Sequence, residues 1–106
     1  MLRAGELSRR GIVQEPSESQ DGRGEVTVAW STYAKRWMSV VPLSGRELFE
    51  AQQVDARVSH RIKMRYDSAI NSRMRIAIGS RIFNIASVIN VDESNEELRL
   101  MCTESV

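Results

Sequence analysis

The chain has 106 residues, with a hydrophobic fraction of 42% and a charged fraction of 27%, as in ordinary globular proteins of one domain. We therefore expect a single domain over residues 1–106. No apolar run approaches the roughly 20 residues of a membrane-spanning helix, and Met1 to Arg10 lacks the apolar core of a signal peptide. These features predict a protein made in the cytoplasm, with no membrane partner.

Charge and cysteine content exclude several function classes. Fifteen basic and fourteen acidic side chains give a formal net charge of +1, which is not the basic balance of a dedicated nucleic-acid binder. Cys102 is the single cysteine, which excludes an internal disulfide, and with the single histidine, His60, it leaves too few ligands for a usual zinc site. We expect neither a metal nor a cofactor.

The first forty residues predict strands around an exposed loop. Residues 12–15 are expected to form a short first strand, whereas Pro16 and the polar residues 17–25 are expected to form a turn or loop. Apolar and polar residues then alternate from Val26, and strand structure is expected to continue to Pro42, with a bend before Ala34.

One helix is predicted next. Ser44 and Glu47 have the spacing of a capping box, and the helix should run about ten residues, to near Gln53. Leu48 and Phe49 give an apolar stripe too narrow for an independent helix. We therefore expect it to lean on its own barrel or on a neighbouring subunit.

Strict alternation follows from Val54 to Tyr66, with apolar residues and His60 at the even positions and polar ones between them. Period two over thirteen residues predicts a half-buried antiparallel strand of about 40 Å. Because this exceeds what a small domain needs, we expect part of it to project as an arm.

The C-terminal third predicts a loop, a hairpin and a final strand. The loop covers residues 67–72, strands 74–78 and 81–91 join through a type II′ turn at Gly79-Ser80, and a polar turn at 92–96 precedes a strand with Leu98, Leu100 and Cys102 on one face. The predicted fold class is mainly β: a small antiparallel β-barrel or sandwich of about six strands, with one short inserted helix and a long projecting strand or loop.

Residues that suggest chemistry have simpler interpretations. His60 lacks a nucleophile or carboxylate at a suggestive spacing and is interpreted as a core or interface histidine. Cys102 lies on the same strand face as Leu98 and Leu100, so its thiol is expected to be buried and chemically unreactive. The acidic turn at 92–97 matches no EF-hand and is expected to be solvated, and Gly22-Arg23-Gly24 is far short of a phosphate-binding motif. We predict no catalytic, metal or cofactor-binding residue.

The polar face of the predicted long strand is basic. This basic stripe consists of Arg57, Arg61, Lys63 and Arg65. Its cations either pair with carboxylates of a neighbouring strand, or meet an acidic partner subunit or the phosphates of DNA in a channel. Likewise, Leu48 and Phe49, with Trp37 nearby, either form a subunit interface or belong to the core. The sequence leaves both pairs of alternatives open.

Several segments together resemble the phage head-tail joining proteins, the head-closure or stopper family of long-tailed phages. The resemblance covers essentially the whole chain, and its most specific piece is Pro-Leu-Ser-Gly-Arg-Glu-Leu at 42–48. Gly11 departs from the family, which usually has a β-branched or larger apolar residue there. The matching segments are 3–7, 40–49, the strand ending at Tyr66, 83–93 and 98–102.

The resemblance implies a structural virion protein of the neck. It would assemble as a homo-oligomeric ring, sixfold rather than twelvefold, below the portal or adaptor, close the DNA channel after packaging, and dock the tail-terminator or tail tube protein. DNA would be close to it without specific contacts. The channel or inter-subunit element would lie in the segment at 43–53, with residues Leu43, Ser44, Gly45, Arg46, Glu47, Leu48, Phe49, Gln52 and Gln53.

Three alternatives remain. The chain could be a tail-terminator or another connector ring protein, because small phage barrels share an architecture. It could be a nucleic-acid-binding barrel, although its aromatics do not alternate with the basic stripe on one strand. An enzyme is the weakest alternative, because no nucleophile with a base can be assembled from these residues.

Overall fold

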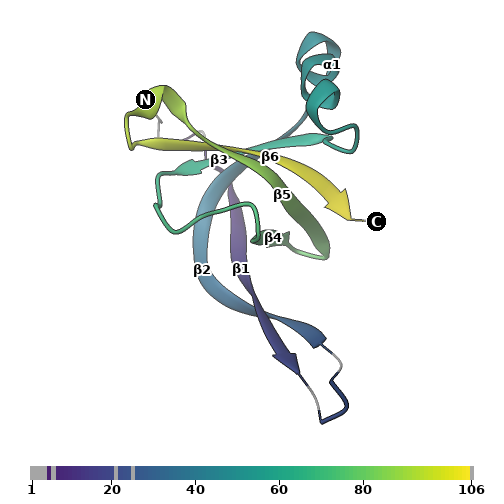
Figure 1. The fold of residues 1–106 in the computed structure, drawn as a ribbon. Helices are drawn as coiled ribbons and strands as arrows, with labels where there is room; N and C mark the ends of the chain where they lie inside the picture. The colour runs from purple at the N-terminus through teal and green to yellow at the C-terminus, as the bar shows by residue number, and fades with distance from the viewer. Residues whose placement is uncertain (1–4, 6, 21, 25, 106) are drawn as a thin grey trace.

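The computed structural model describes residues 5, 7–20, 22–24 and 26–105. In these residues, six antiparallel strands close into a barrel in the order β1, β2, β3, β6, β5, β4 (Figure 1). This confirms the predicted mainly β class with one inserted helix. The elements are β1 (Arg9–Gln20), β2 (Val26–Pro42), α1 (Gly45–Val54), β3 (His60–Arg65), β4 (Arg75–Ile78), β5 (Arg81–Asn90), the 3-10 turn η2 (Val91–Glu93) and β6 (Glu97–Ser105).

The hydrophobic core fills the barrel. Alternate residues of each strand point inward, so the buried positions recur with period two. Phe83, Met38 and Leu100, from three different strands, are among the side chains with no exposed surface. The core cluster consists of Val13, Met38, Ile62, Met64, Ile70, Met74, Ile76, Phe83, Ile85, Leu98, Leu100 and Cys102. None of the described helices is long and apolar enough to cross a membrane.

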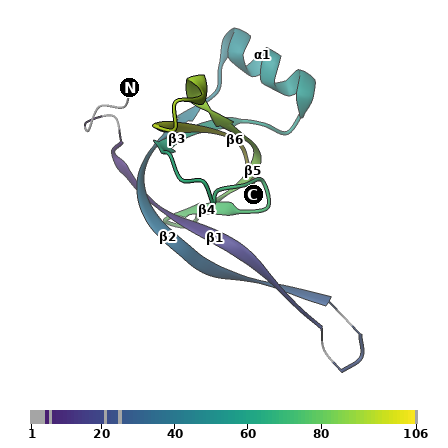
Figure 2. The same ribbon diagram turned by 60° about the vertical axis from the view of Figure 1, so that its left-hand side comes forward.

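A two-stranded arm projects from the barrel. Strands β1 and β2 pair from Arg9 opposite Met38 to Gln20 opposite Val26. However, β1 pairs with β4 only at residues 12–14, and β2 pairs with β3 only at residues 38–42. The rest of the hairpin therefore extends away from the barrel, on the side opposite α1 (Figures 1 and 2). We call residues 15–20 and 26–31 the arm.

The arm corrects two sequence-based expectations. Residues 17–25 were expected to be a loop beginning at Pro16, but β1 continues through Pro16 to Gln20. Pro16 is tolerated because β1 has no partner on its other edge beyond Gln14. A described turn occupies only residues 22–24, and Asp21 and Glu25 lie outside the described residues. The prediction failed because the β1 half of the arm, where Ser17 and Glu18 are exposed, has no alternation of apolar and polar residues.

The expected bend in β2 is confirmed and lies where the arm leaves the barrel. Val13 pairs with Ala34 and Gln14 with Thr32, so Tyr33 is an extra residue that forms a bulge. The Tyr33 hydroxyl donates to both carboxylate oxygens of Asp67, at 3.0 and 3.1 Å. The hydrogen bond to Asp67 is the main cause that raises the pKa of Tyr33. The bulge is thus held against the 67–72 loop.

A second contact supports the base of the arm. The Arg75 guanidinium lies 4.2 Å from the centroid of the Trp30 ring, and its Nε donates to Gln14 Oε1 at 2.7 Å. Gln14 and Trp30 belong to the two strands of the hairpin, and Arg75 belongs to β4. The contact therefore ties both strands of the arm to the barrel wall.

The predicted long strand from Val54 to Tyr66 is wrong. Val54 ends α1, residues 55–59 form a turn, and β3 covers only His60–Arg65. The Leu43 amide donates to the Ser59 carbonyl at 2.9 Å, which closes α1 and its turn into a loop between β2 and β3. The projecting element of the fold is the arm, not this strand.

The remaining predictions for strands and turns are confirmed. Gly79 has φ +60° between β4 and β5, as the first turn position of a type II′ hairpin requires. The 67–72 loop and the polar turn before β6 are present, and Leu98, Leu100 and Cys102 are buried together. Gly11 lies inside β1, which begins at Arg9. The family segment at 3–7 falls partly on Arg3, Ala4 and Glu6, which are outside the described residues.

Candidate functional site

Helix α1 lies on the outside of the barrel and buries none of its residues. Ser44 is the N-cap, but its side chain makes no capping hydrogen bond. The predicted capping box is therefore wrong. Gly45 has φ +57°, a conformation that favours glycine and departs from the helical geometry that a capping box needs. Glu47 pairs with Arg61 of β3 instead of returning to the Ser44 amide.

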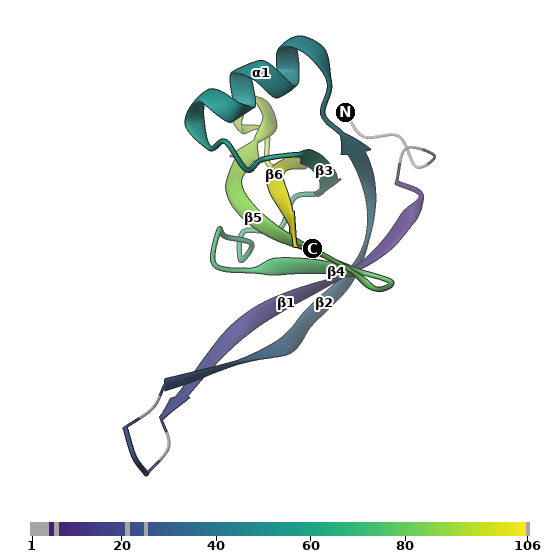
Figure 3. The ribbon, with the colours of Figure 1, turned by 90° about the vertical axis from the view of Figure 1, so that its right-hand side faces the viewer.

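Polar contacts and a cleft separate α1 from the barrel wall. Besides the Glu47–Arg61 pair, the Gln52 side-chain amide donates to the Val58 carbonyl at 3.3 Å. Helix α1 stands outside the barrel (Figure 3). A cleft of about 500 Å³ lies between it and residues of β5 and β6. Its apolar lining includes Val54, Ile89 and Met101. The helix is therefore held at its edges, with space beneath it.

The apolar residues of α1 do not belong to the core. Phe49 is 65% exposed and Val54 is 91% exposed, while Leu48 is half-buried. This excludes the core alternative for Phe49. Within the predicted channel or inter-subunit element, Leu43 is buried at the barrel wall, and the other members besides Leu48 are exposed: Ser44, Gly45, Arg46, Glu47, Phe49, Gln52 and Gln53.

The basic stripe does not exist as a continuous row. Arg57 lies in the turn after α1 and pairs with Asp55 at 3.3 Å. Arg61 pairs with Glu47 of the helix. Both cations are neutralised, but by the helix and its turn and not by the neighbouring strand that the sequence suggested. Lys63 and Arg65 remain on β3, and neither has an ion pair within the described part of the chain.

Lys63 and Arg65 belong to a larger surface formed across the three strands β1, β2 and β3, which we call the basic face. Trp37 lies at its centre, 52% exposed, with the Arg10 guanidinium 5.4 Å from its ring centroid. Because Met38 pairs with Met64, the register brings Trp37 opposite Arg65. The cations of the basic face are Arg10, Lys35, Lys63 and Arg65. Arg99 of β6 lies instead in the cleft under α1.

Outward alternation explains the basic face. Met38, Met64 and Leu98 point inward, so the residues beside them point outward. Arg10 pairs with Trp37 from β1, and Arg65 lies opposite Trp37 from β3, so the register places this ring between two arginines. Sequence reasoning missed Arg10 and Lys35, because it compared residues along one strand. The alternation of Lys35 and Trp37 was the available signal for that part of the face.

The sequence suggested that Trp37 lies near Leu48 and Phe49, but Trp37 is not part of the α1 surface. It lines a separate cleft of about 540 Å³ between the start of β1 and the β4–β5 hairpin. Arg9, Arg10 and Arg81 share this lining, as do Ile78 and Gly79. The exposed aromatics therefore lie on two surfaces, with Phe49 on α1 and Trp37 on the basic face.

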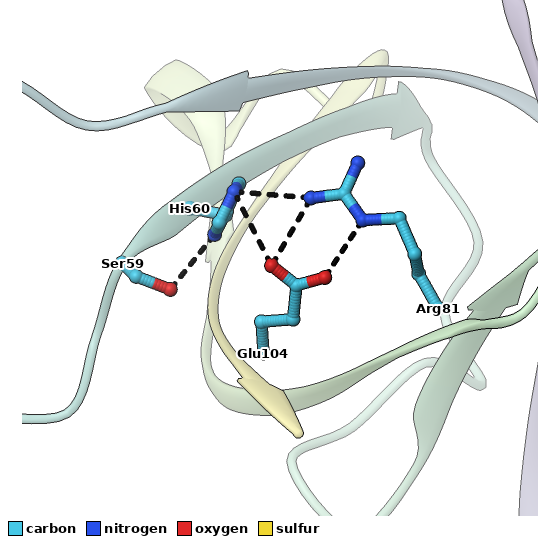
Figure 4. Close-up of polar contacts among 4 residues, drawn as sticks. All are labelled: Ser59, His60, Arg81 and Glu104. Atoms are coloured by element: carbon cyan, nitrogen blue, oxygen red, sulfur yellow. Dashed lines mark hydrogen bonds and ion pairs between the residues drawn. The ribbon is translucent and has the colours of Figure 1, made fainter. Parts of the chain in front are cut away.

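His60 lies in a polar cluster at the end of the barrel (Figure 4). Ser59 Oγ lies 2.7 Å from His60 Nδ1, and the rings of His60 and Phe83 meet edge to face at 5.1 Å. Glu104 Oε1 is 3.9 Å from His60 Nε2, but Arg81 binds this carboxylate at 2.7 and 3.1 Å. The Arg81 hydrogen bond is the main cause that lowers the pKa of Glu104.

This cluster has the residue types of a hydrolase triad but not its geometry. A distance of 3.9 Å is too long for the carboxylate to orient the imidazole by a hydrogen bond. Arg81 also neutralises Glu104. The sequence did not indicate this cluster, because Glu104 and His60 are far apart along the chain and are brought together only when β6 pairs with β3. The cluster ties β3, β5 and β6 together, which fits the predicted role of His60 in the core.

Cys102 is free and buried, and burial raises its thiol pKa to about 12. A thiol that stays protonated is a poor nucleophile. Among the described residues, no group of three or more histidine, cysteine or acidic side chains is placed to hold a metal ion.

A closed barrel with an exposed helix, a projecting arm and a basic face has the features of a protein that binds other macromolecules. Residues 2–105 match the family model described as phage head completion protein, so the chain belongs to the phage head completion protein family. This family is structural, and the protein is a component of the phage virion. The suspected resemblance is confirmed at this level. No curated protein sequence matches the chain.

Two solved structures share the fold. The solution structure of a protein from Shigella flexneri 2a has a TM-score of 0.76 and 26% identity, covering 99% of this chain and 98% of that one. A chain in the virion of a native gene transfer agent particle has a TM-score of 0.67 and 20% identity, covering 94% of this chain and 96% of that one. Both likenesses extend over nearly the whole chain.

Proposed function

We propose that this protein closes the head after DNA packaging: it assembles as a ring under the portal or adaptor, narrows the DNA channel and offers a docking surface to the tail. The observation that carries this proposal is the family match over residues 2–105. The mechanism is steric and electrostatic, without bond chemistry. A closed ring of identical subunits requires two different surfaces on each copy, and the barrel has several exposed ones.

The segment at 43–53 is the proposed channel or inter-subunit element. Phe49 of this segment and Val54, directly after it, are large apolar side chains held in solvent by a helix that buries nothing. A subunit interface or a narrowed channel would cover them. The Glu47–Arg61 pair and the Gln52 contact hold the helix at a defined place on the barrel. A change at this site on tail engagement would reopen the channel.

The basic residues of β3 complete the proposal. Arg61 orients α1 through Glu47, whereas Lys63 and Arg65 are available to an acidic partner or to DNA phosphates. Arg57 acts locally, because it closes the turn after the helix with Asp55. The proposed partners are further copies of this chain, the portal or adaptor above, and the tail-terminator or tail tube protein below.

The first experiment is electron microscopy of lysates from a phage whose copy of this gene is disrupted. Unattached tails beside heads that have lost their DNA are the expected result, and the wild-type gene supplied in trans should restore joined particles. Full heads that retain DNA, beside tails of irregular length, would indicate tail termination and overturn the proposal.

A second experiment tests α1. Residues 45–56 are replaced by a short Gly-Ser linker, which the barrel should tolerate because Leu43 and Ser59 are already hydrogen-bonded. The matched control, Phe49→Ser with Val54→Ser, keeps the helix and changes only its exposed apolar atoms. We expect the deletion to abolish DNA retention and the control to weaken it. Rings that still assemble and retain DNA without the helix would contradict this role.

A further inference from the structure

Opposite charges are separated between the arm and the rest of the molecule. The arm, residues 15–20 and 26–31, contains two acidic side chains and no basic one, a formal charge of −2. The rest of the chain therefore carries +3, because the total is +1. On the described part of the arm, Glu18 is exposed and Glu15 is half-buried near its base. The nearly neutral chain thus has an acidic projection and a basic body.

The cations of the basic face have no paired anion among the described residues. No ion pair joins Arg10, Lys35, Lys63 or Arg65 to a carboxylate there. In register, only Glu97 stands opposite Arg65, and it is buried. Clustered cations repel one another, so an acidic surface placed over them would be stabilised.

We propose that the arm of one copy lies across the basic face of the next copy. The proposal rests on the proposed ring, and it names the two surfaces that build it. A contact between an arm and a different surface is heterologous, so repeating it around an axis closes a ring. Electrostatic complementarity would set the register between neighbouring copies.

The arm cannot reach the basic face of its own barrel. Strand β2 carries Val28 on the arm and Trp37 on the face, and nine residues of extended chain, about 30 Å, lie between them. The arm projects away from the barrel in every view (Figures 1, 2 and 3). Its six paired positions are about 20 Å long, and the molecule is 28–29 Å across its two shorter axes. An arm can therefore cover much of a neighbouring barrel.

Apolar side chains on both surfaces fit the same contact. Trp37 is 52% exposed and Val28, on the arm, is 51% exposed. A tryptophan surrounded by arginines is the composition of an interface hot spot. DNA is the less suitable occupant of this face, because the acidic arm would repel phosphates and the net charge of the chain is only +1.

Crosslinking within assembled particles tests the geometry. Glu18→Cys is combined with Lys63→Cys and supplied to the gene-disrupted phage, and joined particles are treated with a short bis-maleimide. The native Cys102 is buried and should not react. We expect a ladder of covalent multimers on a denaturing gel. The matched control, Glu18→Cys with Glu93→Cys, places the second thiol on the exposed turn before β6 and should give no ladder.

Charge exchange tests the energetics. Glu15→Lys with Glu18→Lys should lower the yield of tailed particles by about tenfold or more, because like charges then meet. Adding Lys63→Glu and Arg65→Glu should restore most of the loss. Glu93→Lys with Glu96→Lys makes the same change in net charge elsewhere and should have little effect.

The outcomes separate this inference from the proposed function. If the wild-type gene restores head-tail joining but the crosslinking pair gives no ladder in joined particles, the arm contact is wrong and the function stands. If reversal of the basic face is harmful and reversal of the arm neither matters nor compensates, the face binds DNA or another protein, and the inference is overturned. If the wild-type gene fails to restore joining, the function itself is wrong.

Discussion

The barrel and its two appendages differ in where their apolar surface goes. The barrel buries side chains from all six strands, and Phe83, Met38 and Leu100 expose nothing. Helix α1 buries no residue, and none of the arm side chains that the structure describes is buried. Folding free energy comes mainly from apolar burial, so the barrel holds the fold and the appendages are free to serve contacts with other molecules.

The strongest test of this comparison uses the two phenylalanines. Phe83→Ala should lower the free energy of unfolding by about 3–5 kcal/mol, because it removes a fully buried ring and leaves a cavity. Phe49→Ala should change it by less than about 0.5 kcal/mol, because Phe49 is 65% exposed on α1. Urea denaturation followed by tryptophan fluorescence measures both. Equal losses would mean that α1 belongs to the folding core.

A second test concerns the crowded contact between β1 and β2. Gly11 is buried, and a Cβ at this position would overlap the end of the Met38 side chain. Gly11→Ala should cost about 1–3 kcal/mol as Met38 is forced to repack. Because Met38 has no exposed surface, its flexible end has little room to move aside.

A double-mutant cycle isolates that contact. Met38→Val shortens the side chain that the new Cβ would meet, so Gly11→Ala should cost less in the Met38→Val background than in the wild type. Gly22→Ala is the control, because a Cβ at Gly22 meets nothing within 4 Å. Additive losses in the cycle would show that Gly11 is required for another reason.

The sequence predicted the elements whose two faces differ in burial. The β2 strand, the hairpin at Gly79 and the inward residues of β6 follow directly from alternation and turn chemistry. The same rule failed at residues 54–59, where Val54 is 91% exposed at the end of a helix and alternates with polar residues without forming a strand. The alternation of apolar and polar residue types predicted a strand there, because residue type alone does not show which side chains are buried.

The candidate site was only partly predictable. The exposed apolar residues of α1 were located from the narrow stripe around Leu48 and Phe49. Of the arm, residues 26–31 were predicted as strand, but residues 17–20 were taken for a loop. The basic face depends on pairing between strands that are far apart in the chain, such as Arg10 opposite Trp37 and Trp37 opposite Arg65. Such neighbours are fixed by the register of the closed barrel, which a single strand does not reveal.

A smaller effect should mark the junction between barrel and arm. Arg75→Ala removes the guanidinium above Trp30 and the hydrogen bond to Gln14, and should cost about 1 kcal/mol. Arg73→Ala is the control, because that side chain is exposed. Amide hydrogen exchange should become faster in the arm of the Arg75 variant while the barrel core stays protected. Faster exchange throughout the barrel would show that the junction also holds the core.

The smallest effect concerns pH and the Arg81–Glu104 pair at the barrel end. The hydrogen bond from Arg81 lowers the pKa of Glu104 from its ordinary value of 4.5. A lowered folded-state pKa contributes stability above pH 4.5, and this contribution is lost as the pH falls through the folded-state pKa. Glu104→Gln removes the titrating group, so the denaturation midpoint of this variant should fall less steeply than that of the wild type below about pH 4.5.

The control for this test is Phe49→Ala. Because the Arg81–Glu104 pair lies on the barrel, joining the ends of β5 and β6, Phe49→Ala should leave the slope of the midpoint against pH unchanged. A slope unaffected by Glu104→Gln would assign the acid sensitivity to other carboxylates, with Asp55, whose pKa Arg57 lowers, as the next to test.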